Sequence, residues 1–135
     1  MASIEWTEEL SVKIPSIDNQ HKVLIKLINK FDDARTKGNA NMVLKSILKE
    51  LVRYTQAHFI YEEALFTNYG YPESDNHKIA HVKLFDKVAQ FDKAELKDDQ
   101  DLYNDISEFL NNWLYHHILK EDMAYSSHLV QQGAA

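Results

Sequence analysis

Seven side chains with imidazole or carboxylate donors recur along this chain at intervals that suit helical faces. They are His21, His58, Glu62, His77, His81, His117 and Asp122. Imidazole nitrogens and carboxylate oxygens are common ligands of first-row transition metals. Five imidazoles and two carboxylates are too many ligands for one such ion, and they are the number expected for two. The pattern therefore predicts a binuclear metal centre.

Two of the pairs have a spacing that places both donors on one face of a helix. His58 with Glu62, and His77 with His81, are four residues apart, so each pair presents its donors about 6 Å from each other. A single buried histidine is more often a hydrogen-bonded core residue than a ligand. That simpler interpretation loses weight here because four separate segments repeat the feature, and four helices can bring such side chains together in a bundle core.

The last pair is less regular. His117 and Asp122 are five residues apart, which separates them by roughly 140° around a regular helix. Glu121 lies four residues after His117, so the spacing alone favours Glu121 as the ligand. Asp122 can serve if the helix widens locally, as in a π-bulge, or if it reaches the metals from another side as a bridging ligand. The spacing leaves both alternatives open.

Four amphipathic segments are available to position these side chains. In each segment apolar residues join the donors at intervals of three and four, which is the period of a helix with one buried face. Short connections between such helices predict an all-α fold, an antiparallel up-and-down four-helix bundle. The predicted helices cover about residues 18–37, 41–68, 74–92 and 99–129.

The connections between these helices contain residues that end or begin helices. Gly38 is suited to the position after the first helix, and Gly70-Tyr71-Pro72 interrupts the chain after the second. Ser74 can cap the third helix, and the polar run Lys97-Asp98-Asp99-Gln100 predicts the last turn, with either aspartate as a cap.

Residues 1–17 are predicted to form an arm that packs across the bundle. Apolar residues there are mostly spaced by two, and Pro15 argues against a helix in this stretch. Trp6 belongs to the arm, and Asp18 is placed to cap the first helix.

Composition and charge exclude several classes of protein. The chain has 135 residues, 44% of them hydrophobic and 27% charged, which fits one folded domain spanning residues 1–135. Its net charge of −6 argues against nucleic acid or an anionic membrane as a partner. The absence of cysteine excludes disulfides, thiolate metal sites and iron–sulfur clusters. With no signal-like N-terminus and no long apolar run, a cytoplasmic protein without membrane insertion is expected.

Taken together, these motifs resemble those of the bacterial hemerythrins. The resemblance spans essentially the whole chain, and its ligand pattern of H, HxxxE, HxxxH and HxxxxD is complete. The matching segments are residues 14–21, 58–63, 70–72, 77–81 and 113–122.

The resemblance implies two non-haem iron ions per chain. Asp122, and not Glu121, is then the second bridging carboxylate beside Glu62, with an oxo or hydroxo group as third bridge. One iron is held by His77, His81 and His117, and the other by His21 and His58. On this count the first iron has six ligands, whereas the second has five and keeps one open position. Zinc more often takes four ligands, and manganese is not excluded.

The function implied by the resemblance is reversible O₂ binding for storage or transport, without enzymatic activity. Azide or similar anions are expected to bind the oxidised form, the protein is expected to be a monomer, and no acceptor for the oxygen is identified. The alternatives are an O₂ or redox sensing module and a di-iron oxidase or iron-binding protein. The residues implied to line the apolar O₂ pocket are Leu24, Phe59, Trp113, Leu114 and Ile118.

Overall fold

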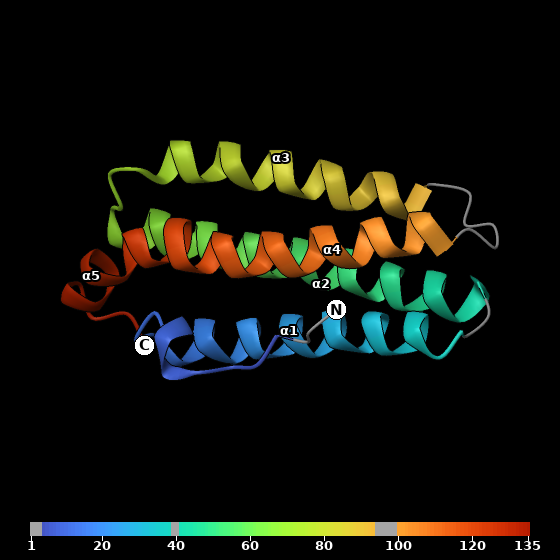
Figure 1. Ribbon diagram of the computed structural model, residues 1–135. Helices are drawn as coiled ribbons and strands as arrows, with labels where there is room; N and C mark the ends of the chain where they lie inside the picture. Colours follow the sequence, from blue (N-terminus) through green and yellow to red (C-terminus); the bar gives the residue numbers. More distant parts are fainter. Residues whose placement is uncertain (1–3, 39–40, 94–99) are drawn as a thin grey trace.

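In the computed structural model the protein is built from helices, and the described residues, 4–38, 41–93 and 100–135, contain no strand. Four long helices lie alongside one another, and a short fifth helix closes one end of the molecule (Figure 1). The elements are η1 Glu8–Leu10, α1 Pro15–Thr36, α2 Asn41–Tyr69, α3 Ser74–Lys93, α4 Gln100–His116, the π-helix η2 His117–Asp122 and α5 Met123–Gln131.

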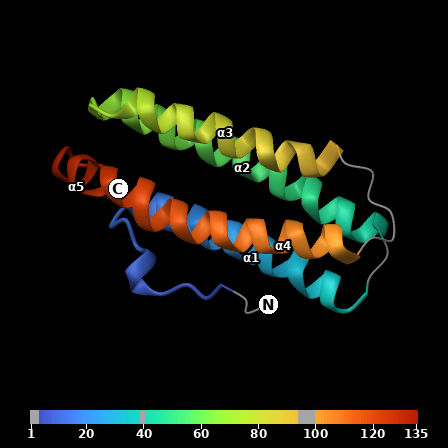
Figure 2. The same ribbon diagram turned by 45° about the horizontal axis from the view of Figure 1, so that its top comes forward.

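The four long helices run alternately up and down. α1 packs against α2 and α4, and α2 packs against α3. Figure 2 shows the same arrangement from a second direction, with the N-terminal arm lying outside α1. This confirms the all-α bundle predicted from the periodicity. None of the helices in the described part of the chain is long and apolar enough to cross a membrane.

The predicted break after α2 is a glycine cap. Gly70 has a φ of +65°, a conformation that costs glycine little because it lacks a Cβ. The backbone N–H of Tyr71 then donates to the carbonyl of Phe66 at 3.0 Å, and the rings of these two residues pack 5.2 Å apart. This is the Schellman arrangement, in which the hydrophobic contact accompanies the cap. Gly38, with a φ of +70°, follows α1 in the same way.

The first helix begins earlier than predicted. α1 starts at Pro15, with Ile14 as the preceding residue in extended conformation. Proline is favoured at the first helical position because its missing N–H has no partner there in any helix. The prediction that Pro15 excludes a helix was therefore wrong at this position. The predicted turn at Lys97-Asp98-Asp99 lies outside the described residues.

The arm is tied to α1 by polar contacts. Asp18 accepts hydrogen bonds from the Ser11 hydroxyl at 2.6 Å and from the backbone N–H of Val12 at 2.9 Å. Asp18 thus anchors the arm and is not a cap, because the helix begins three residues before it. Further along, the backbone N–H and carbonyl of Ile4 both bond to the side-chain amide of Asn29.

Two apolar clusters divide the interior. The bundle-core cluster fills most of the space between the four helices and includes Leu24, Phe59, Trp113, Leu114 and Ile118. The end cluster closes the bundle at α5. Its buried members are Val12, Ile14, Ile17, Phe66, Tyr71, Tyr125, Leu129 and Ala134.

Candidate metal centre

The predicted donor side chains meet near one end of the bundle. His21 lies in the second turn of α1, and His77 and His81 lie in the first half of α3, whereas His58 and Glu62 lie in the second half of α2. In an up-and-down bundle the starts of odd-numbered helices adjoin the ends of even-numbered ones. Helical alternation therefore brings these positions to the end nearest α5 (Figure 1).

All seven predicted ligands are buried, with at most 5% of any residue exposed. Their donor atoms form two overlapping groups, and within each group every donor atom lies within 4.8 Å of the others. Both groups contain Glu62 and Asp122. One adds His77, His81 and His117, and the other adds His21 and His58.

The two shared carboxylates face the imidazoles differently. Asp122 places Oδ2 at 2.9 Å from Nε2 of His21, and Oδ1 at 3.1 Å from Nε2 of His117 and 3.3 Å from that of His77. Its two oxygens thus serve different groups. Glu62 presents a single oxygen, Oε1, to both groups, at 3.1 Å from Nε2 of His58 and 3.3 Å from Nε2 of His81.

A π-helix brings Asp122, and not Glu121, beside His117. Residues His117–Asp122 form a turn in which the backbone pairs i with i+5. Two residues five apart then share one face, so Asp122 comes to lie with His117 and is fully buried. Glu121 is half-buried and belongs to neither donor group of the described residues.

The donor atoms suit metal binding better than hydrogen bonding among themselves. Nε2 of all five histidines, Oε1 of Glu62 and both oxygens of Asp122 are buried without a hydrogen-bond partner among the described residues. Their contacts of 2.9–3.3 Å lack hydrogen-bond alignment. Buried polar atoms are normally paired, so a buried cluster of unpaired lone-pair donors calls for a cation. Nitrogen and oxygen donors of this kind suit iron.

The same closeness shifts the pKa of the charged groups. Burial opposes ionisation of Asp122, but the neighbouring His117, with His21 and His77, outweighs burial and holds the pKa of Asp122 well below its usual value. Burial and Asp122 likewise oppose ionisation of Glu62, and His58 and His81 still hold its pKa below the ordinary range. For His117 burial favours the neutral ring, yet the Asp122 carboxylate raises its pKa. Without metal, the cluster therefore favours anionic carboxylates and raises the proton affinity of His117.

Three residues that support the donors escaped the sequence reasoning. The buried hydroxyl of Tyr125 donates to Oε2 of Glu62. Nδ1 of His58 bonds to the side-chain oxygen of Gln20 at 2.6 Å, and Nδ1 of His81 bonds to the carboxylate of Glu63 at 2.9 Å. The place of Glu63 directly after a ligand predicts that it faces outward. That prediction is wrong, because α3 packs beside α2 and brings His81 to it.

The predicted O₂-pocket residues are all buried, with exposures of 6% or less, and two of them contact the rings of predicted ligands. Phe59 stacks on His81 with ring centroids 3.8 Å apart and lies 5.9 Å from the ring of His117. Trp113 lies 6.2 Å from the ring of His117. Leu24, Leu114 and Ile118 belong to the same bundle-core cluster.

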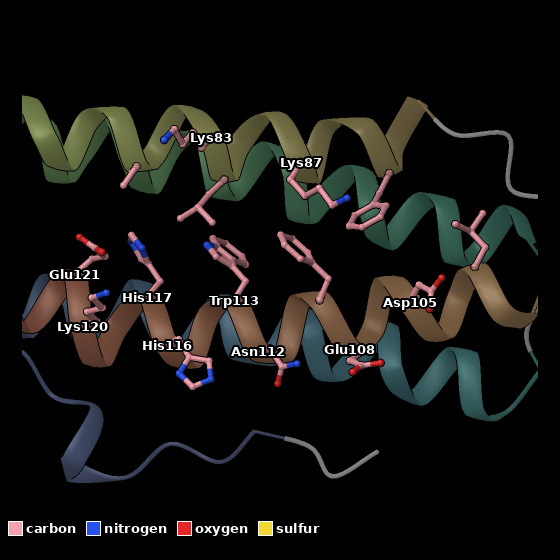
Figure 3. Close-up of a pocket in the computed structure, with 15 residues that line it drawn as sticks. Lys83, Lys87, Asp105, Glu108, Asn112, Trp113, His116, His117, Lys120 and Glu121 are labelled. Carbon is pink, nitrogen blue, oxygen red and sulfur yellow. The ribbon is translucent and has the colours of Figure 1, made fainter.

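A groove of about 880 Å³ runs between α3 and α4 and reaches one of the predicted ligands. Figure 3 shows Trp113, from α4, and His117, from η2, pointing into this groove, whereas His116 and Asn112 point away from it. Its apolar lining is contributed by Leu84, Phe91, Leu102, Phe109 and Trp113.

Other candidate residues fall outside the donor groups. His116 lies about 100° around the helix from His117, which predicts a surface residue or a neighbour of the ligands, and His116 is exposed. The sequence predicts packing for Tyr61 and Tyr115. Tyr61 packs half-buried against the end cluster, whereas Tyr115 is exposed. The place of His128 beyond the last ligand predicts a solvated side chain, and this is wrong. Its Nε2 lies 2.8 Å from the carbonyl oxygen of Tyr69, at the end of α2, where helices leave carbonyls without internal partners.

Comparisons with known proteins agree with this geometry. The Hemerythrin HHE cation binding domain matches residues 12–129. Bacteriohemerythrin of Pseudomonas aeruginosa is 33% identical over 93% of this chain and 80% of its own length. That of Methylococcus capsulatus is 32% identical over 93% and 95%. A crystal structure of wild-type hemerythrin, 30% identical, superposes with a TM-score of 0.82 over 95% of this chain and 98% of that one. The chain belongs to the hemerythrin family.

Proposed function

We propose that this protein holds two non-haem iron ions and binds O₂ reversibly, for oxygen storage or transport. The observation that carries the proposal is the pair of overlapping donor groups that share Glu62 and Asp122. In this assignment His77, His81 and His117 hold one ion, and His21 and His58 hold the other. The bound irons would supply the electrons that reversible O₂ binding requires.

The unequal donor counts indicate where an external ligand has room. The half of the site with His21 and His58 supplies one imidazole fewer than the other half. O₂, or azide in the oxidised protein, would enter the coordination sphere there. Because the ion held by His21 and His58 would keep one open position and the surroundings are apolar, the site would favour a small diatomic or triatomic ligand.

The balance of charges favours binding over oxidation chemistry. Five neutral imidazoles and only two carboxylates line the site. Carboxylate-rich sites stabilise high oxidation states of iron better than imidazole-rich sites do, so the donor set disfavours cleavage of the O–O bond. The buried aromatic and aliphatic residues around the donors also exclude water and anions that promote loss of the bound ligand. We therefore propose a binding protein and not an oxidase.

The test is one cycle of oxygenation of iron-loaded protein. Metal analysis should find about two irons per chain. The colourless reduced protein should develop a visible absorption band in air, take up one O₂ per two irons, and lose the band when O₂ is removed. Recovery of most of the reduced protein after a single cycle is the expected result. Direct conversion to the oxidised state with release of peroxide at each exposure would instead identify a reductant-consuming oxidase.

A further inference from the structure

Two of the five histidines bond through Nδ1 to a second side chain, and these two side chains differ in charge. Nδ1 of His81 lies 2.9 Å from Oε2 of Glu63, and Nδ1 of His58 lies 2.6 Å from Oε1 of Gln20. A carboxylate and an amide oxygen can only accept hydrogen bonds, so both rings must donate through Nδ1. Each ring then turns Nε2, as a lone-pair donor, toward Glu62.

The two contacts are otherwise closely matched. His58 and His81 are each 2% exposed, and their Nε2 atoms lie 3.1 and 3.3 Å from the same oxygen of Glu62. Gln20 and Glu63 are both half-buried, on α1 and α2 respectively. The remaining difference is one negative charge, which stands behind the ring in the half of the site that contains three histidines.

A carboxylate behind a ligand histidine strengthens that ligand more than an amide does. Accepting the Nδ1 proton increases the electron density of the ring, and the full negative charge of Glu63 also attracts a cation a short distance beyond it. An amide oxygen orients the ring equally well but carries only a partial charge. The two halves therefore differ in the partner of one histidine each, His81 and His58, as well as in the number of their histidines.

We infer that Glu63 and Gln20 make the two metal positions unequal. Glu63 is a positioning residue that makes the half with His77, His81 and His117 the first to take a divalent cation. Gln20 orients His58 without adding charge, so the half with His21 fills second. This inference rests on the proposed metal site but does not depend on O₂ binding.

The number of histidines favours the same order of filling, so a charge exchange is needed to separate the two causes. Glu63→Gln and Gln20→Glu are nearly isosteric, and each retains an oxygen that can accept the Nδ1 proton. The first removes the charge from one half, and the second adds a charge to the other. A structural role alone would affect both positions similarly, whereas the charge affects only its own half.

The experiment is a calorimetric titration of the metal-free protein with Co²⁺ under nitrogen, followed in parallel by the visible absorption of the bound ion. Wild-type protein should bind two Co²⁺ in two resolved steps. Glu63→Gln should weaken the tighter step by about 10- to 100-fold, the usual effect of mutating such a partner, and leave the weaker step unchanged. Gln20→Glu should tighten the weaker step, and the double variant should bring the two affinities together.

Equal affinities of wild-type and Glu63→Gln protein at both steps would overturn the inference. An equal shift of both steps, or a single step in the wild-type protein, would overturn it as well. Thermal unfolding of each metal-free variant tests whether it folds, and Gln20→Glu provides an independent measurement should Glu63→Gln be unstable. A protein that binds two Co²⁺ unequally but fails to bind O₂ when loaded with iron would refute the proposed function and leave this inference standing.

Discussion

On the side of the donor site that faces α5, polar contacts hold the ligands, whereas on the side that faces the bundle-core cluster the contacts are apolar. Tyr125 donates its hydroxyl to Glu62, and Asp122, the residue before α5, faces three imidazoles. On the opposite side, Phe59 stacks on His81 and Trp113 packs near His117. The two sides thus have separate roles. In the proposed function, the α5 side would set where ions are held, and the core side would set what can reach them.

The largest effect is expected on the α5 side, from Asp122→Ala. The carboxylate of Asp122 faces both donor groups, so its loss removes a ligand from both positions. The irons bound per chain, measured by metal analysis after iron loading and gel filtration, should fall from about two to one or none.

Glu121→Ala is the matched control, because it deletes a carboxylate one residue away that lies outside both donor groups. It should retain about two irons per chain. The opposite pattern, with loss of iron in Glu121→Ala and retention in Asp122→Ala, would mean that the π-helix does not place the bridging carboxylate.

On the core side, Leu114→Ala should change access without releasing the ions. Leu114 is 1% exposed, and its truncation should cost about 2–5 kcal/mol of unfolding free energy. The space created would admit water and anions, so autoxidation and azide binding should both become faster. Stopped-flow absorption measures the azide rate, and metal analysis checks that two irons remain.

Leu110→Ala controls for the loss of packing, since Leu110 is equally buried in the same cluster one turn farther from His117. It should lose similar stability but keep the wild-type azide rate. Equal azide rates in all three proteins would remove Leu114 from the access path and weaken the proposed division.

A smaller effect is expected from Tyr125→Phe, again on the α5 side. The change leaves Oε2 of Glu62 buried without its donor, which should cost about 1–3 kcal/mol of stability in metal-free protein. Iron should also be lost faster to a chelator, while the azide rate stays at the wild-type value. Tyr115→Phe alters an exposed ring and should change neither the stability nor the rate of iron loss. A faster azide rate in Tyr125→Phe would contradict the separation of the two sides.

The smallest effect is expected in the pH dependence of the stability of the metal-free protein. The pKa values of Glu62 and Asp122 are lowered by folding. Their contribution to the stability of the folded protein is therefore complete above the unfolded values of about 4 and is lost in acid. The pKa of His117 is raised, so its contribution is complete below about 6.5 and is lost as pH rises through the folded pKa. Melting temperatures from about pH 3 to 9 should therefore be highest between about 4 and 6.5.

Asp122→Asn removes the carboxylate that raises the pKa of His117, and it should flatten the alkaline part of this profile. A tenfold difference in proton affinity between the folded and the unfolded chain corresponds to about 1.4 kcal/mol of stability. A wild-type melting temperature that stays constant from about pH 6.5 to 9 would contradict a raised pKa of His117 in the metal-free protein.

Much of the site could be predicted because its information is local. The four-residue spacing predicts that His58 and Glu62 share one helix face, and that His77 and His81 share another. Asp122 is expected to reach the site if the helix widens locally, and η2 is such a widened turn. Glu63 could not be placed in this way, because its role depends on how α3 is rotated against α2.

Tyr125 and His128 show the same limit. Both follow the π-helix, whose extra residue changes the face on which every later residue lies. Spacing within a regular helix therefore misplaces them. In the folded chain one bonds to Glu62 and the other lies against the carbonyl of Tyr69.

The extra residue in η2 also changes the angular position, around the helix axis, of the residues that follow it. In an uninterrupted helix, Tyr125 and Leu129 would lie roughly 80° and 120° away from His117. The π-turn contains one extra residue, so every later residue is rotated back by about 100°. The angles of Tyr125 and Leu129 then become roughly −20° and +20°, and Asp122 lies at roughly 40°. Tyr125, Leu129 and Asp122 are indeed all fully buried.

A deletion of one residue within 118–121 could therefore be absorbed, because η2 would become a regular turn and leave Asp122, Tyr125 and Leu129 on their present face. A deletion at Met123 or Ala124 could not be absorbed in this way. If η2 persisted, Asp122 would stay inward and α5 would turn by about 100°, and if η2 became regular, α5 would stay in place and Asp122 would turn outward. The extra residue must therefore lie before Asp122 in the sequence. In that place it lets one helical segment direct Asp122 into the candidate metal site and the apolar residues of α5 into the closed end of the bundle.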